Sequence, residues 1–285
     1  MDSIHTPARP KLAMCNLFSD VKKLGQFALA HGFSGIDWSF EPTTLPQTPA
    51  DESMWADRLG ALGPLEVRFH CPFHRIDLGH VDPWEAKAAE TIFCNIIRLV
   101  AKVKGRFLTI HIGLGRNSTE PLSWDKTAEN LSRVVQYGAS HGVKVCLENL
   151  AWGWTSRPHL FEKLIRGSGA GVTFDIGHAH ACESIKTQQF EIEDFVTPHA
   201  DRVLNAHIYH TELSKRGHIP PKRLEEIEDR LEILKRIGCG WWVLEVWDEE
   251  GLLQTKKIID EYLTHTRHWA KSHHQGSSVD IASNG

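Results

Sequence analysis

The stretch GVTFDIGHAH, residues 171–180, joins a short apolar run to a group of polar residues. Residues 171–176 are predicted to form a strand, because the run is short, nearly all apolar and begins at a glycine. Such a run is typical of a parallel strand that is covered on both faces. Asp175 therefore lies at the carboxyl end of a buried strand, and His178 and His180 follow it directly.

The same unit of an apolar run followed by a helical pattern recurs along the chain. Serine or aspartate often begins the helical part and glycine ends it, as helix caps require. The predicted strands are residues 11–18, 35–40, 65–70, 106–112, 144–150, 171–176, 202–209 and 240–246. The predicted helices are residues 19–30, 52–62, 84–102, 123–141, 159–166, 192–198, 221–237 and 252–269.

Strands and helices that alternate in this way predict a closed (β/α)8 barrel, a TIM barrel, in the α/β class. A doubly wound sheet is the alternative, but no glycine-rich dinucleotide fingerprint follows any predicted strand. The barrel is predicted to span residues 1–270 as one domain. Residues 271–285 are polar, rich in serine and histidine, and predicted to be a disordered tail.

Composition narrows the classes of function. With 41% hydrophobic and 24% charged residues, the 285-residue chain is typical of a globular protein. Its 32 basic and 36 acidic residues give a net charge of −4, which argues against a nucleic-acid partner. A small-molecule substrate is expected, and a homo-oligomer is compatible with the sequence.

The cell compartment is predicted from the same data. No apolar run is long enough to cross a membrane, and the first residues show no secretory signal. The 6 cysteines are scattered without a C-x-x-C pair, as expected of reduced thiols. We therefore expect a cytoplasmic enzyme.

Polar residues mark the carboxyl ends of the predicted strands, where barrels of this kind hold their active sites. They are His70, His111, Glu148, Asp175, His207 and Glu245. Buried carboxylates that lack a partner cost several kcal/mol, and three of them at one rim would repel one another. A divalent cation such as manganese, zinc or cobalt would resolve this cost, because imidazole and carboxylate are ligands of these metals.

A structural role is the alternative for each of these residues taken alone. A single histidine at a strand end is more often hydrogen-bonded than metal-bound, and a lone acid is often paired with arginine. The same applies to the loop residues His180, His210 and His218. Because polar residues end successive strands, the group as a whole favours a metal site.

At these residues the sequence resembles the xylose-isomerase-like barrel superfamily, which contains sugar phosphate isomerases and epimerases together with endonuclease IV (AP endonuclease family 2). The matching segments are FHCPF (69–73), TIHIG (109–113), LENL (147–150), FDIGHAH (174–180), AHIYH (206–210) and LEVW (244–247). They follow the superfamily's order across nearly the whole predicted barrel.

The resemblance implies two different ligand sets. Likeness to the epimerases implies one metal ion, with His178 contacting substrate and with the ligands Glu148, Asp175, His207 and Glu245. Likeness to endonuclease IV adds His70, His111, His178 and His218 as ligands of two or three zinc ions. Endonuclease IV has an aspartate where this chain has Arg216, so that ligand is expected to be missing. The epimerases commonly carry an aspartate where this chain has His210.

Two chemistries follow. The first is isomerisation or epimerisation of a small sugar, sugar phosphate or related polyol through a metal-stabilised enediolate, with Glu148 and Glu245 transferring protons and His178 stabilising a substrate oxygen. The second is hydrolysis at a multinuclear zinc site that includes His70 and His111. A lyase would use the same residues, and a metal binder without activity is a further alternative.

Aromatic and basic residues near the predicted mouth are candidates for substrate binding. Tryptophans could form an apolar wall for a sugar ring, and arginines could hold a phosphate or carboxylate. Ordinary packing or solvation is the alternative for each. These candidates are Trp38, Trp152, Trp154, Arg157, Arg216 and Trp247.

Overall fold

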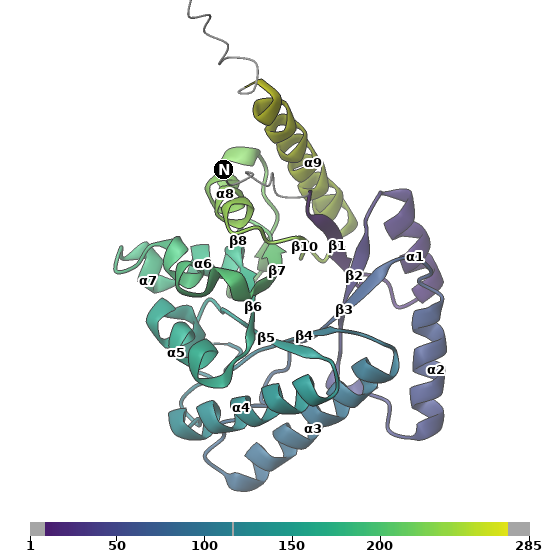
Figure 1. Cartoon of the computed structure of the whole chain (residues 1–285), viewed down its shortest axis with the longest axis vertical. Coiled ribbons are helices and arrows are strands. Elements are labelled where there is room, and N and C mark those ends of the chain that lie inside the picture. Colours follow the sequence, from purple (N-terminus) through teal and green to yellow (C-terminus); the bar gives the residue numbers. More distant parts are fainter. Residues whose placement is uncertain (1–8, 116, 273–285) are drawn as a thin grey trace, which may run out of the picture.

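A closed barrel of eight parallel strands forms the centre of the structure (Figure 1). This computed structural model describes residues 9–115 and 117–272. The order around the barrel is β1-β10-β7-β6-β5-β4-β3-β2. The strands are β1 (Lys11–Cys15), β2 (Gly35–Ser39), β3 (Glu66–Cys71), β4 (Phe107–Ile110), β5 (Lys144–Glu148), β6 (Gly171–Asp175), β7 (Val203–Ile208) and β10 (Trp241–Leu244). The predicted (β/α)8 barrel is confirmed.

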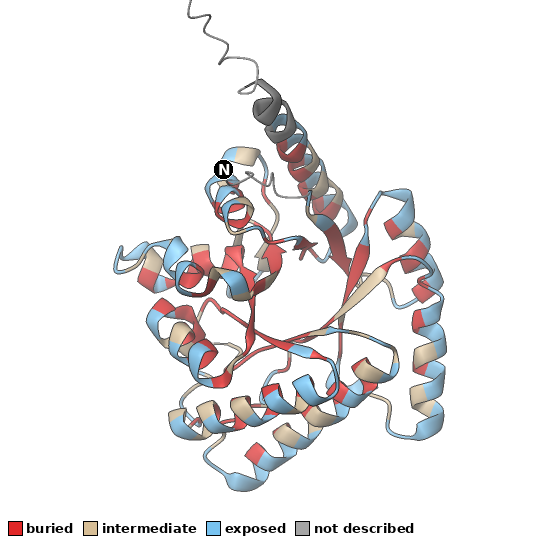
Figure 2. Ribbon diagram, in the orientation of Figure 1, coloured by how far each residue is buried: buried red, intermediate tan, exposed pale blue. Residues whose placement is uncertain are grey.

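Helices cover the outside of the barrel, with their buried residues on one face and their exposed residues on the other (Figure 2). The longer ones are α1 (Val21–Ala30), α2 (Pro49–Gly60), α3 (Pro83–Lys102), α4 (Trp124–Ser140), α5 (Pro158–Ser168), α8 (Glu228–Arg236) and α9 (Glu249–Ser272). Asp20, Thr48, Asp82 and Ser123 cap α1 to α4 by accepting backbone N–H bonds. Of the predicted tail, Lys271 and Ser272 belong to α9, and residues 273–285 lie outside the described residues.

The segments after β6 and β7 differ from the predicted pattern. β6 leads directly into α6 (Ile176–Ala181) and α7 (Glu183–Lys186), and the predicted helix at residues 192–198 is two 3-10 turns, η3 (Ile192–Phe195) and η4 (Thr197–Arg202). After β7 the chain forms a two-stranded antiparallel hairpin, β8 (Thr211–Leu213) with β9 (Gly217–Ile219). The predicted helix at residues 221–237 is divided into a 3-10 turn, η5 (Leu224–Glu226), and the shorter α8.

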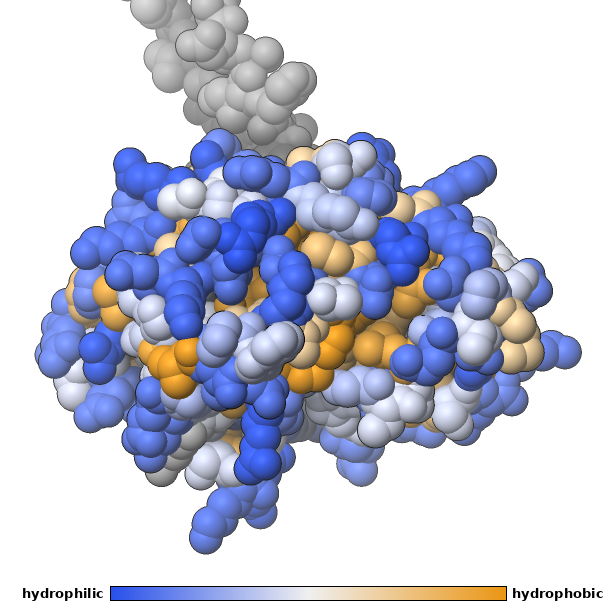
Figure 3. Space-filling view, turned by 90° about the horizontal axis from the view of Figure 1, so that it is seen from below, coloured by the Kyte–Doolittle hydropathy of each residue, from blue (hydrophilic) through white to orange (hydrophobic). Residues whose placement is uncertain are grey.

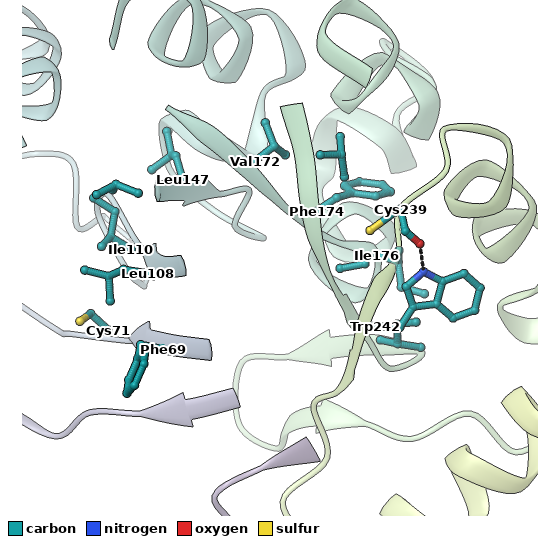
Figure 4. Packing of buried hydrophobic residues seen from close by; sticks show 14 of the residues in the cluster. Phe69, Cys71, Leu108, Ile110, Leu147, Val172, Phe174, Ile176, Cys239 and Trp242 are labelled. Carbon is teal, nitrogen blue, oxygen red and sulfur yellow. Dashed lines mark hydrogen bonds between the residues drawn. The ribbon is translucent and has the colours of Figure 1, made fainter. Parts of the chain in front are cut away.

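Alternation along the strands separates two packing layers. One set of side chains faces the helices and forms the main apolar cluster, part of which is shown in Figure 4 with the hydrogen bond from Trp242 Nε1 to the Cys239 carbonyl oxygen, 2.8 Å long. A smaller cluster of Ala13, Cys15, Trp241 and Val243 is separate from the main one.

Polar groups fill much of the barrel interior below the carboxyl ends. The Arg68 guanidinium stacks on Phe107 and Trp241, and it donates to the Leu204 carbonyl oxygen. Above it, the hydroxyls of Thr109 and Thr173 are 2.7 Å apart. These side chains fill the interior of the barrel, and the polar residues at the carboxyl ends of the strands lie above them.

The outer surface is mainly hydrophilic on the face seen in Figure 3, with apolar residues between the polar ones. Among the described helices, none has both the length and the apolar character needed to cross a membrane. All of Cys15, Cys71, Cys94, Cys146, Cys182 and Cys239 are free thiols.

Gly35 allows β2 to approach the interior base. A Cβ at this position would overlap the Trp241 ring and the Glu66 carbonyl oxygen. We expect Gly35→Ala to lower the free energy of unfolding by about 1–3 kcal/mol in urea titrations, as overpacking does. Gly60→Ala is the matched control, since no atom lies within 4 Å of its added Cβ. Equal stability of the two variants would contradict this packing.

Candidate functional site

Polar side chains from consecutive strands meet inside the barrel at its carboxyl end. Each comes from the last residues of a strand or the residue just after it, and each is buried. Alternate residues of a strand lie on the same face, so the position of a residue in its strand decides whether its side chain points into the barrel. The group comprises Asp37, His70, His111, Glu148, Asp175, His207 and Glu245.

The first cluster is centred on His207. Its Nδ1 lies 2.8 Å from Glu245 Oε2, 3.2 Å from Glu148 Oε1 and 3.8 Å from Asp175 Oδ2. One donor atom from each of the four residues lies within 4.8 Å of the others. All four atoms are buried and none has a hydrogen-bond partner, although the three carboxylate oxygens lie within 4.0 Å of His207 Nδ1. Three carboxylates and one imidazole that converge in this way fit a divalent transition-metal ion.

A second cluster uses the other oxygen of Glu148. Glu148 Oε2 is 3.0 Å from His111 Nε2 and 3.3 Å from His70 Nε2, and the two imidazole nitrogens are 2.9 Å apart. These three residues also offer donor atoms close enough for one cation. Glu148 therefore presents its two oxygens to two separate donor sets.

A third cluster lies at the β8–β9 hairpin, where the sequence predicted a missing carboxylate. Glu212 on β8 pairs with His218 on β9, and its Oε2 is 2.8 Å from His178 Nε2. Arg216 is exposed at the turn. Sequence reasoning missed Glu212, which lies opposite His218 in the hairpin. The signal in the sequence was Gly217, a residue typical of a hairpin turn, and in the structure Gly217 has a φ of 68°.

His178 is held firmly by its surroundings. Asp175 Oδ1 accepts the His178 backbone N–H at 2.6 Å and caps α6. His178 Nδ1 lies 3.0 Å from the Asn149 carbonyl oxygen, which leaves Nε2 for Glu212. Gly177 makes room for the Tyr209 ring, and that ring stacks on His218 with centroids 3.9 Å apart.

The electrostatics of the protein without a bound cation follow from burial and close charges. Burial disfavours protonated His207 and His178, but nearby carboxylates outweigh it and raise the pKa of both well above the usual value. Burial likewise opposes ionised Glu148 and Glu245, but His207 outweighs it and lowers the pKa of each. Burial raises the pKa of Asp175 well above its ordinary value. Protons on imidazoles thus partly balance the crowded carboxylates.

Asp37 is a further member of the group that sequence reasoning missed. It lies on β2, 3.5 Å from His70 Nδ1 and 3.8 Å from His207 Nε2, both measured to its Oδ2. Burial would lower the pKa of His70, but Asp37 and Glu148 outweigh it and raise this pKa to about 9. The alternation of residues 35–39 between the two faces could have marked Asp37 and Trp38 as alternatives for the inward position.

Other predicted residues lie farther from the clusters or on the outside of the barrel. Trp38 was expected near the mouth of the barrel, but it packs against the apolar cluster between barrel and helices, because Asp37 takes the inward position on β2. Trp154 packs edge-on against Trp124 at 5.2 Å. Trp152 is partly buried, and the exposed residues are Arg157, Arg216 and Trp247.

The loop histidines His180 and His210 lie beside each other, with ring centroids 5.0 Å apart. Burial and the neighbouring Arg230 lower the pKa of His180 to about 4, so it stays neutral. His210 Nδ1 faces the Glu226 carbonyl oxygen at 3.3 Å. Neither belongs to the groups that could hold a metal ion among the described residues.

Known proteins share this fold. A curated, uncharacterized protein of Methanocaldococcus jannaschii is 29% identical over 198 residues, which are 69% of this chain and 80% of that protein. The crystal structure of a D-tagatose 3-epimerase-like protein matches with a TM-score of 0.69 and 19% identity, over 91% of this chain and 99% of that one. An L-ribulose 3-epimerase matches with a TM-score of 0.67 and 17% identity, over 96% and 100%.

At these identities the solved structures support the fold of the chain. A family model described as the xylose isomerase-like TIM barrel matches residues 26–269, which include every residue of the three clusters. The match covers the site as well as most of the barrel. The chain therefore belongs to the xylose isomerase-like TIM barrel family.

Proposed function

We propose that the protein is a divalent-metal-dependent isomerase or epimerase of a small sugar, sugar phosphate or related polyol. The observation that carries the proposal is the first cluster: four buried donor atoms without a hydrogen-bond partner lie within 4.8 Å of one another, and they belong to Glu148, Asp175, His207 and Glu245. Manganese, cobalt or zinc suits such a donor set. A cation there would supply the Lewis acidity that stabilises negative charge on substrate oxygens.

Glu148 and Glu245 are the proton-transferring groups in this proposal. The lowered pKa of each keeps its carboxyl group ionised in the protein without a bound cation, and the ionised form is the one that can accept a proton. Each has one oxygen in the first cluster and a second oxygen facing His70, at 3.3 Å for Glu148 and 3.8 Å for Glu245. In the barrel β6 and β7 separate β5 from β10, so the two carboxylates approach from different sides. This placement suits removal and return of a proton on opposite faces of one carbon.

His178 is proposed to bind a substrate oxygen. Its raised pKa keeps it protonated, and the Asn149 carbonyl oxygen holds its Nδ1. The Nε2 proton, which now lies against Glu212, is the one available to an oxygen of the substrate. Trp152 and the exposed Arg157, Arg216 and Trp247 remain proposed substrate contacts on the loops.

Two of the solved structures with this fold bear the names of sugar 3-epimerases, which supports a small sugar as substrate. Free thiols at every cysteine support a reducing compartment, and we propose the cytoplasm.

A second candidate function is metal-assisted hydrolysis. It is favoured by one specific observation: Glu148 Oε2 meets His70 Nε2 and His111 Nε2 in a second donor set next to the first. Paired metal ions that share a carboxylate suit activation of water and stabilisation of a leaving oxygen. The third cluster, His178 with Glu212 and His218, adds a further donor set close enough for one cation.

Glu148→Gln should reduce turnover about 100-fold or more, because it removes a proton acceptor and a donor of both sets. The assay incubates ketopentoses and ketohexoses, free and phosphorylated, in D2O and follows deuterium uptake by NMR. Glu90→Gln on the surface of α3 is the matched control and should retain activity. Full activity of Glu148→Gln would refute the assignment.

His70→Ala should separate the two candidate functions. An isomerase that uses the first cluster should lose activity only modestly, since His70 is outside that cluster. A hydrolase that uses the second cluster should lose about 100-fold or more, measured on bis(p-nitrophenyl) phosphate. The exposed His141→Ala is the control. Phosphodiester cleavage by the unsubstituted chain that His70→Ala abolishes would replace the isomerase by the hydrolase.

Metal binding should release protons near pH 7. His207 is protonated in the metal-free protein because its pKa is raised, whereas a ligand imidazole must be neutral. The apparent affinity should therefore rise with pH until His207 loses its proton. Calorimetric titration with Mn²⁺ in buffers of different ionisation enthalpy measures the release. His180→Gln should leave it unchanged, and binding heats that do not vary with the buffer would contradict the expected protonation.

A further inference from the structure

Asp37 occupies a position between two of the site histidines. Its Oδ2 lies 3.5 Å from His70 Nδ1 and 3.8 Å from His207 Nε2. The two imidazole rings are close to each other, with centroids 5.0 Å apart. All three polar atoms are buried without a hydrogen-bond partner. One carboxylate oxygen thus faces both rings.

The nitrogens that face Asp37, His70 Nδ1 and His207 Nε2, are called the outer nitrogens here, because the other nitrogen of each ring faces the first or second cluster. His70 directs its other nitrogen, Nε2, at Glu148 Oε2 in the second cluster, and His207 directs Nδ1 at the first cluster. A histidine that binds a metal usually donates its remaining N–H to a carboxylate, which sets the tautomer and the ring orientation. Asp37 has the chemistry and the place to do this for both rings.

Few other acceptors compete for these outer nitrogens. Glu245 Oε1 is 3.8 Å from His70 Nδ1, farther than Asp37. Among the described residues, no other carboxylate oxygen lies within 4.0 Å of His207 Nε2. Both distances to Asp37 exceed a direct hydrogen bond by roughly 0.5 Å, so a small closing movement completes the contact.

We propose that Asp37 is a positioning residue that orients His70 and His207 together and so couples the first and second clusters. It acts through the two imidazoles and leaves the metal-binding positions to the cluster residues. The proposal rests on the proposed metal-dependent function. It assigns a role to Asp37 of β2, whose carboxylate offers no donor atom to the first cluster and forms with His70 and His207 a further group close enough to hold a cation.

The test measures cobalt binding by Asp37→Asn, which keeps the shape of the side chain and removes its charge. Co²⁺ affinity is read by competition with a chromophoric chelator, and its visible absorption spectrum reports the ligand geometry. We expect affinity to fall about 10- to 100-fold and the absorption bands to shift. Asp37→Ser, which removes both carboxylate oxygens, should lose more Co²⁺ affinity than Asp37→Asn. It is the variant to measure if Asp37→Asn does not fold.

Glu66→Gln is the matched control, because Glu66 lies at the opposite end of the adjacent β3 and pairs there with Lys11 and Arg68. Wild-type affinity and spectrum in Asp37→Asn, or an equal loss in Glu66→Gln, would overturn the positioning role. Loss of a whole cobalt ion per chain would make Asp37 a ligand and overturn it as well. A wild-type chain that binds no cobalt would overturn the proposed function, and this inference with it.

Discussion

Three carboxylates share one small volume around His207, at the carboxyl end of a barrel whose strands are otherwise largely apolar. Ionised groups this close repel one another in a dry interior, and burial adds a desolvation cost. In the protein without a bound cation, the raised pKa of His207 and of His178 shows how protons offset the charge. A divalent cation would offset the negative charge of the carboxylates more fully than these protons do.

Packed and hydrogen-bonded side chains fill the barrel below the site. Arg68 closes the base by stacking on Trp241, and the Thr109 and Thr173 hydroxyls bond across the barrel above it. Side chains at the carboxyl ends therefore rest on a packed layer. Because residues alternate along a strand, the same geometry that turns Asp37 inward turns Trp38 outward to the helices. The site and the apolar core are thus two faces of the same strands.

Patterns that repeat locally could be predicted from the sequence. Apolar runs marked every barrel strand, capping residues marked the starts of α1, α3 and α4, and polar strand ends indicated the residues that meet in the first two clusters. Periodicity carries this information because a buried strand must be apolar wherever it faces the core. Asp37 was missed because the alternation of residues 35–39 places Asp37 and Trp38 on opposite faces of the strand but does not say which of the two faces inward.

The loops after β6 and β7 could not be predicted, because contacts distant in sequence shape them. Arg230, fully buried on α8, donates to the carbonyl oxygens of Ile176 and His210, and so ties α6 and the end of β7 together. Arg230 and Ile176 are 54 residues apart in the sequence. The hairpin of β8 and β9 brings Glu212 to His178, a contact that Gly217 alone, as a turn signal, does not specify.

The central claim is that the first cluster holds a divalent ion, and elemental analysis of the purified chain tests it most directly. The chain would be purified without chelators, desalted and measured by mass spectrometry for manganese, cobalt and zinc. The account predicts at least one tightly held ion per chain. A chain that carries none, and takes up none after incubation with each of these ions and renewed desalting, would contradict it.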